Sequence, residues 1–133
     1  MENINQGKRV LVVDDNADAL KMICTVLTDA GFVAVGASNA DDAVECVRAQ
    51  VPNLLIIDYF MPGADGVVTL RRCRALPGTS NMIAVMLTAD ERLSTLEHAL
   101  ARGFDEFLTK TSLGDGFIER LRDVIARKTL PLG

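Results

Sequence analysis

One stretch decides the fold of this chain: Asn53-Leu54-Leu55-Ile56-Ile57-Asp58-Tyr59-Phe60-Met61-Pro62-Gly63-Ala64-Asp65-Gly66. Its four consecutive aliphatic residues do not alternate with polar ones, which is typical of a central strand in a parallel sheet with helices on both faces. Asp58 follows directly, and a carboxylate at the carboxyl end of such a strand points into the crevice where open α/β sheets bind ligands. Pro62, Gly63 and Gly66 then break the chain before the next helical pattern. A lone Asp in this place could also be a simple cap, so the rest of the chain has to decide.

The size and composition fit one domain, which we expect to span residues 1–133. The chain has 133 residues, of which 49% are hydrophobic, enough for a substantial core. No apolar run approaches the roughly 18 residues of a membrane span, and the first nine residues lack the apolar stretch of a secretory signal. We therefore expect a cytosolic protein without membrane contact. The net charge of -4 argues against direct binding of nucleic acid and favours proteins or small ions as partners.

The three cysteines, Cys24, Cys46 and Cys73, are odd in number and lack C-x-x-C spacing. They fall on the apolar faces of expected helices. We therefore expect buried, reduced thiols rather than metal ligands or a disulfide.

Five strand patterns alternate with five helical patterns along the whole chain. The expected strands are residues 9–13, 32–37, 54–57, 81–87 and 104–109. Asn16 is the expected N-cap of the first helix, and the S-x-x-D sequence from Ser38 to Asp41 is expected to open the second. This alternation predicts an α/β protein with a doubly wound parallel sheet.

Side chains with coordinating or reactive chemistry follow four of these five strands. They are Asp14 and Asp15, Asp58, Thr88, and Lys110. Because the carboxyl ends of the strands share one edge of the sheet, these groups should converge on one crevice. Two like unit charges 4 Å apart repel by about 4 kcal/mol at an effective dielectric constant of 20, so the carboxylates need a cation. All-oxygen ligands suit Mg²⁺, while Thr88 and Lys110 can bind an oxyanion.

As a set, these motifs resemble the receiver domain of the two-component response regulators. The resemblance rests on Asp14-Asp15, on Asp58 with Met61-Pro62-x-x-Asp65-Gly66, on Thr88-Ala89 and on Thr109-Lys110, in the family's order and spacing. It covers roughly residues 8 to 128. It implies a single flavodoxin-like (βα)5 domain with a five-stranded sheet of order 2-1-3-4-5.

The resemblance also implies roles for the acidic residues. Asp58 corresponds to the phosphoacceptor. Asp15 corresponds to a direct Mg²⁺ ligand and Asp14 to one that acts through water, while the main-chain carbonyl of Phe60 corresponds to the third protein ligand. Mg²⁺ is thus the expected cofactor.

The remaining roles concern signalling. Thr88 and Lys110 resemble the groups that contact the phosphoryl oxygens, and Phe107 takes the place of the aromatic switch residue. Once Asp58 is phosphorylated, Thr88 can follow the new oxygens inward and Phe107 can fill the space that it leaves. The resemblance implies an altered surface on the fourth helix, fifth strand and fifth helix, where an output protein would dock.

We expect a stand-alone response regulator, because the five residues after Lys128 are too few for an output module. A sensor histidine kinase or a histidine phosphotransfer protein would supply the phosphoryl group, and the chain would catalyse only its own phosphorylation and dephosphorylation. A receiver cut from a hybrid kinase, acting as a relay, stays open. An aspartyl-phosphate hydrolase is disfavoured because Asp58-Tyr59-Phe60 lacks a second acid, and a nucleotide or flavin carrier because no Gly-rich phosphate loop follows the first strand.

One position departs from the family's pattern. Thr111 follows Lys110, where the family usually has proline after a cis peptide bond. A cis bond before a residue other than proline costs roughly 2.5 to 4 kcal/mol. We therefore expect a trans Lys110-Thr111 bond and a displaced loop over residues 111–116.

Overall fold

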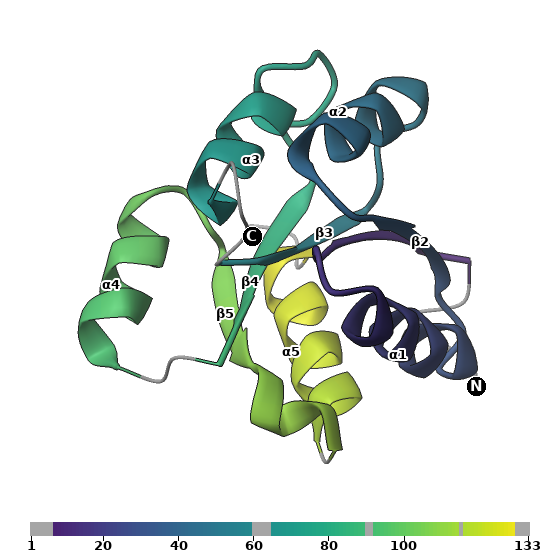
Figure 1. Ribbon diagram of the computed structural model, residues 1–133, viewed down its shortest axis with the longest axis vertical. Coiled ribbons are helices and arrows are strands. Elements are labelled where there is room, and N and C mark those ends of the chain that lie inside the picture. Colours follow the sequence, from purple (N-terminus) through teal and green to yellow (C-terminus); the bar gives the residue numbers. More distant parts are fainter. Residues whose placement is uncertain (1–6, 60–64, 90–91, 115, 130–133) are drawn as a thin grey trace.

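The computed structural model of the chain describes residues 7–59, 65–89, 92–114 and 116–129. Within these ranges, strands and helices alternate as the sequence predicted (Figure 1). The elements are β1 (Arg9–Val13), α1 (Ala17–Asp29), β2 (Val33–Ala37), α2 (Ala40–Ala49), β3 (Leu54–Asp58), α3 (Gly66–Arg74), β4 (Ile83–Thr88), α4 (Leu93–Ala101), β5 (Glu106–Thr109), the short 3-10 helix η1 (Lys110–Gly114) and α5 (Phe117–Thr129).

The strands form one parallel sheet in the order β2-β1-β3-β4-β5, which confirms the doubly wound fold and its implied strand order. Val13 of β1 pairs with Ile57 of β3, and Asp58 pairs with Leu87 of β4. Because this register brings the carboxyl ends of the three central strands level, the residues that follow them lie side by side at one edge.

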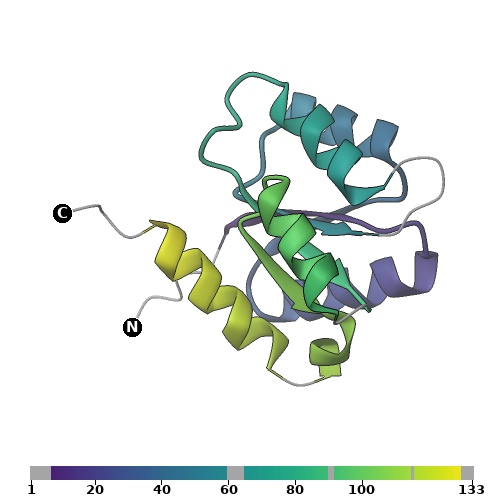
Figure 2. The same ribbon diagram turned by 90° about the vertical axis from the view of Figure 1, so that its left-hand side faces the viewer.

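The sheet lies between two layers of helices, as Figure 2 shows edge-on. On β3, Leu55 and Ile57 belong to the core that also contains residues of α2 and α3, whereas Leu54 and Ile56 belong to the core with residues of α1 and α5. All four side chains are buried. The uninterrupted aliphatic run therefore had the predicted cause, namely a strand covered on both faces.

The starts of α1, α2 and α3 are fixed by side-chain caps. Asn16 accepts a hydrogen bond from the Ala19 N–H at 2.9 Å, as predicted. The cap of α2 is Asn39 rather than Ser38, so that prediction was one residue off. Asn39 accepts from the Asp42 N–H at 2.7 Å and donates from its own amide to the Asp42 carboxylate at 3.1 Å. Asn39 therefore satisfies one backbone N–H of the first turn, and the Asp42 carboxylate orients the capping amide.

Two strands begin later than predicted, because an aromatic residue before each strand closes the preceding helix. The Phe32 N–H donates to the Leu27 carbonyl, and the Phe104 N–H donates to the Ala99 carbonyl. Each is the long hydrogen bond of a Schellman motif, so neither N–H is available to the sheet. β2 therefore starts at 33 rather than 32, and β5 at 106 rather than 104. β4 starts at 83 rather than 81, because the Met82 N–H closes a turn on the Thr79 carbonyl.

Within the described residues, no helix is long and apolar enough to cross a membrane. All three cysteines are free thiols, but only Cys73 is fully buried, and burial raises its pKa to about 11. Cys24 and Cys46 are half-buried, so the expectation of burial was too strong for these two.

The first prediction concerns Gly103, which follows α4 with a φ of +106°. An added Cβ would meet only Leu70 Cδ2 at 3.8 Å, an ordinary contact, so backbone strain alone decides the effect. We expect Gly103→Ala to lower the free energy of unfolding by about 1–2 kcal/mol, as measured by urea denaturation.

Gly114→Ala is the matched control. Its Cβ would meet nothing within 4 Å, and its φ is not positive. We expect a change within about 0.5 kcal/mol. Equal stability of the two variants would contradict the role of the positive φ.

Candidate functional site

Three carboxylates gather at the carboxyl edge of the sheet. Asp14 follows β1, Asp58 ends β3, and the two strands are neighbours in register. Together with Asp15, they offer oxygens that lie within 4.8 Å of one another. Asp14 and Asp58 are buried, with 1% and 7% of their surface exposed, whereas Asp15 is exposed. The structure thus brings the predicted acidic residues together.

Lys110 reaches this cluster from the end of β5. Its Nζ lies 3.4 Å from Asp58 Oδ2 and 3.4 Å from Asp14 Oδ2. The ammonium therefore bridges two carboxylates that would otherwise repel each other. Three carboxylates and one ammonium leave a formal charge of 1 − 3 = −2 at the site.

One oxygen of Asp14 carries this charge without full compensation. Oδ1 accepts a hydrogen bond from the Asn16 N–H at 2.9 Å. Oδ2 is buried and has no hydrogen-bond partner in the described part of the chain. Lys110 Nζ lies within ion-pair distance of this oxygen but does not form a hydrogen bond with it. A buried carboxylate oxygen without a hydrogen bond lowers the stability of the fold unless positive charge offsets it. Lys110 supplies one positive charge for three carboxylates, so a further cation would add stability. The donor set is all oxygen, which fits a hard divalent cation such as Mg²⁺.

Thr88 lies next to the acidic cluster. It ends β4, where it pairs with Thr109 of β5. It directly follows Leu87, which pairs with Asp58 of β3, and its side chain is fully buried. Its place between the ends of β3 and β5 suits a hydroxyl that contacts an oxyanion bound at Asp58.

Gly66 lies close to the backbone of Asp58 and Tyr59. The Gly66 N–H donates to the Tyr59 carbonyl at 2.9 Å. A Cβ at this position would lie 2.9 Å from the Asp58 carbonyl oxygen and 3.2 Å from Tyr59 Cα, which are backbone atoms that cannot turn away. The sequence marked Gly66 only as a turn breaker, but the approach of two backbone segments also requires it. Phe60, whose carbonyl was the predicted third metal ligand, lies outside the described residues, as do residues 61–64.

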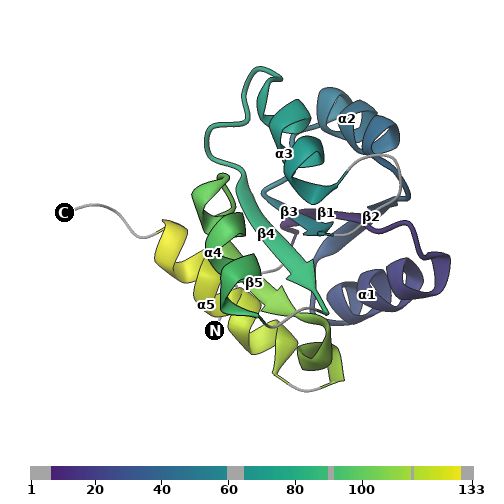
Figure 3. The same cartoon turned by 60° about the vertical axis from the view of Figure 1, so that its left-hand side comes forward.

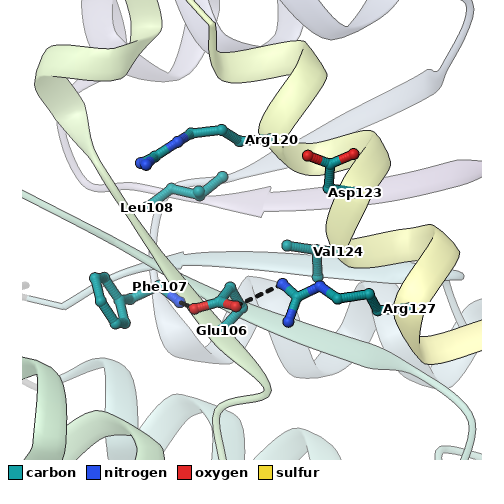
Figure 4. A pocket seen from close by; sticks show the side chains of 7 residues that line it. All are labelled: Glu106, Phe107, Leu108, Arg120, Asp123, Val124 and Arg127. Carbon is teal, nitrogen blue, oxygen red and sulfur yellow. Dashed lines mark hydrogen bonds and ion pairs between the residues drawn. The ribbon is translucent and has the colours of Figure 1, made fainter.

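Phe107 lies apart from the acidic cluster, on the edge strand β5. It is half-buried against the core that also contains residues of α2 and α3. It also lines a hollow of about 370 Å³ between β5 and α5, where Glu106 pairs with Arg127 at 2.7 Å and accepts a hydrogen bond from the Phe107 N–H at 3.1 Å. Figure 4 shows the Phe107 ring pointing away from α5. This hollow is lined by charges of both signs and none of the acidic cluster, so we place the candidate chemistry at Asp58.

The Lys110-Thr111 peptide bond is trans, as predicted, since the described residues contain no cis bond. The chain turns directly into η1 after β5. Whether the loop over residues 111–116 is displaced relative to that of other receivers stays a prediction.

Comparison with known proteins relates the chain to one family. A family model described as the response regulator receiver domain matches residues 10–122. The phosphate regulon transcriptional regulatory protein PhoB of Escherichia coli (strain K12) is 31% identical over 121 residues, which are 91% of this chain and 53% of PhoB. The chain therefore spans about half the length of this relative.

Solved structures agree on the fold. The chemotaxis protein CheY4 of Vibrio cholerae matches with a TM-score of 0.83 at 23% identity, over 89% of this chain and 98% of the other. A putative response regulator from Chloroflexus aurantiacus J-10-fl matches with a TM-score of 0.79 at 28% identity, over 92% of this chain and 100% of the other.

The geometry of the site generates a prediction for Gly66. We expect Gly66→Ala to lower the free energy of unfolding by about 1–3 kcal/mol, because the new methyl group would press on fixed backbone atoms. Gly36→Ala is the comparison, because its Cβ would meet only the movable side chain of Leu20 at 3.0 Å and beyond. Thermal and urea denaturation measure both, and a larger loss for Gly36→Ala than for Gly66→Ala would contradict this account.

Proposed function

The chain belongs to the response regulator receiver domain family, and from this premise we propose that Asp58 accepts a phosphoryl group from a phosphohistidine on a partner protein. The observation that carries the proposal is the bridging position of Lys110, 3.4 Å from both Asp14 and Asp58. A cation held beside a buried carboxylate is what a nucleophile needs when it attacks a negatively charged group.

Asp58 acts as the nucleophile in this proposal. One carboxylate oxygen attacks the phosphorus atom, an acyl phosphate bond forms, and the bond from phosphorus to the histidine nitrogen breaks, with the electron pair leaving on the imidazole. Lys110 reduces the repulsion between the carboxylate and the incoming oxygens, and then balances the charge that the product keeps. Because there is little other covalent chemistry for the protein to do, positioning supplies most of the rate.

Asp14, Asp15 and Asp58 would hold Mg²⁺, with the main-chain carbonyl of Phe60 as a further ligand. When bound, the ion neutralises charge on the carboxylates and on the transferred oxygens. The fit is supported by the formal charge of −2 and by the buried Asp14 Oδ2 without a hydrogen bond. The resemblance to the family assigns contact through water to Asp14, which is buried, and direct contact to Asp15, which is exposed.

Thr88 and Phe107 would convert phosphorylation into a change of surface. The Thr88 hydroxyl donates to a phosphoryl oxygen, which draws the end of β4 toward Asp58. Phe107 is only half-buried, so its ring has room to move inward when Thr88 leaves its place.

The proposed partners follow from these roles. A histidine kinase or a histidine phosphotransfer protein supplies the phosphoryl group, and an output protein docks on the face formed by α4, β5 and α5. The chain signals by docking and catalyses no reaction beyond its own phosphorylation and dephosphorylation. Signalling as an independent protein and relaying within a hybrid kinase share this chemistry.

The proposed Mg²⁺ site can be tested by thermal denaturation. Binding to the folded state alone stabilises a protein by about 1.4 kcal/mol when the free ligand is ten times its Kd. We therefore expect Mg²⁺ to raise the melting temperature by several degrees in the wild type and much less in Asp15→Ala. Asp18→Ala, an exposed acid in the first turn of α1, is the control and should respond like the wild type. A full response in Asp15→Ala would refute the metal assignment.

The phosphoacceptor is tested with acetyl phosphate and Mg²⁺. Intact-mass spectrometry should show one added phosphoryl group on the wild type and none on Asp58→Asn, because the amide is not a nucleophile. Asp41→Asn, at an exposed carboxylate on α2, should be labelled like the wild type. Equal labelling of Asp58→Asn and the wild type would sink the assignment.

A further inference from the structure

α4 has few buried side chains among those that the structure describes. Arg92 at its start makes no side-chain capping hydrogen bond, whereas α1, α2 and α3 all have one. Of the side chains described on α4, those of residues 97–101, only Ala99 is buried, and Leu100 is 46% exposed. Figures 1 and 3 show the helix beside β5 at the outside of the fold. Contacts of its exposed side chains can therefore influence where the helix rests.

One such contact reaches the neighbourhood of Asp58. The ring of His98, on α4, meets the ring of Tyr59 with centroids 6.3 Å apart and planes at 86°. This is an edge-to-face arrangement of favourable geometry. His98 is otherwise exposed, and Tyr59 is half-buried against the core.

Tyr59 is rigidly attached to the site. It follows Asp58 directly, its N–H donates to the Leu87 carbonyl at 3.2 Å, and its carbonyl accepts from the Gly66 N–H at 2.9 Å. Its backbone is therefore fixed to the strands that carry the acidic cluster, and the Tyr59–His98 contact ties α4 to those strands.

We propose that the Tyr59–His98 contact holds α4 in the arrangement in which the Asp58 carboxylate pairs with Lys110, and that it opposes the phosphorylated arrangement. This inference rests on the proposed function. Thr88 ends β4, and the chain continues from it to the start of α4 at Leu93. When Thr88 moves toward a phosphoryl oxygen, it shifts the start of α4, and this helix of nine residues, about two and a half turns, transmits that shift to His98. Tyr59 is anchored by its place directly after β3 and by its hydrogen bond to Gly66 of α3, so it follows this shift less than α4 does.

The two states then differ by the free energy of this contact. Aromatic pairs of this kind change an equilibrium constant by about two- to tenfold. Because a contact present in only one state weakens the binding of any ligand that needs the other state, its loss should tighten the binding of a phosphoryl analogue by that factor. His98 and Tyr59 are thus positioning residues, and neither needs to touch the phosphoryl group.

The test is a titration of the full chain with beryllofluoride, an analogue of the phosphoryl group, at fixed Mg²⁺. The chain has one tyrosine and no tryptophan, so its tyrosine emission reports on Tyr59 alone. We expect His98→Ala to bind beryllofluoride about two- to tenfold more tightly than the wild type. His98→Phe keeps a ring at the contact and should stay within twofold of the wild type.

Glu97→Ala is the matched control, because Glu97 is the exposed neighbour of His98 on the same helix. It should bind like the wild type, which separates the ring contact from a general effect of alanine on α4. Equal or weaker binding in His98→Ala than in Glu97→Ala, with the wild type responding normally, would overturn the inference alone. No response in the wild type beyond that of Asp58→Asn would overturn the proposed function and, with it, this inference.

Discussion

The structure depends on placing like charges side by side in a buried position. Two neighbouring parallel strands, β1 and β3, end level with each other, and each delivers a carboxylate to the same edge of the sheet. Apolar packing on both faces of β3 sets the backbone register, and this register holds the two carboxylates together despite their repulsion. Lys110 relieves part of this repulsion, and a cation bound in the proposed metal site would offset the remainder. The apolar core and the charged site are therefore two aspects of one packing arrangement.

The residues of the site lie on elements that differ in how firmly they are packed. Asp14, Asp58 and Thr88 follow or end the three central strands, whose side chains are buried on both faces. Lys110 starts the short helix η1 beyond an edge strand, and α4 has few buried side chains where they are described. In the proposed mechanism, the rigid parts hold the chemistry and the weakly held parts respond.

Much of this could be predicted from the sequence, because the deciding signals are local. An uninterrupted aliphatic run indicates a strand with helices on both faces. Parallel strands bring their carboxyl ends to one edge of the sheet, so the residues that follow them, Asp14, Asp15, Asp58 and Lys110, could be predicted to lie together. The errors were local as well. Phe32 and Phe104 have the apolar character of strand residues, but the glycine before each one turns it into a helix terminator. The Tyr59–His98 contact had no signal in the sequence, since it depends on where α4 lies against the sheet.

Asp14 has a consequence for how such a protein changes under selection. Its buried Oδ2 lacks a hydrogen bond and faces other carboxylates, so the folded state without a cation carries a local electrostatic penalty. An amide at this position would remove a negative charge and could donate a hydrogen bond to a neighbouring carboxylate. A laboratory selection for heat resistance alone would therefore favour its loss, at the expense of the proposed metal site. Stability and the proposed activity therefore make opposite demands on this position.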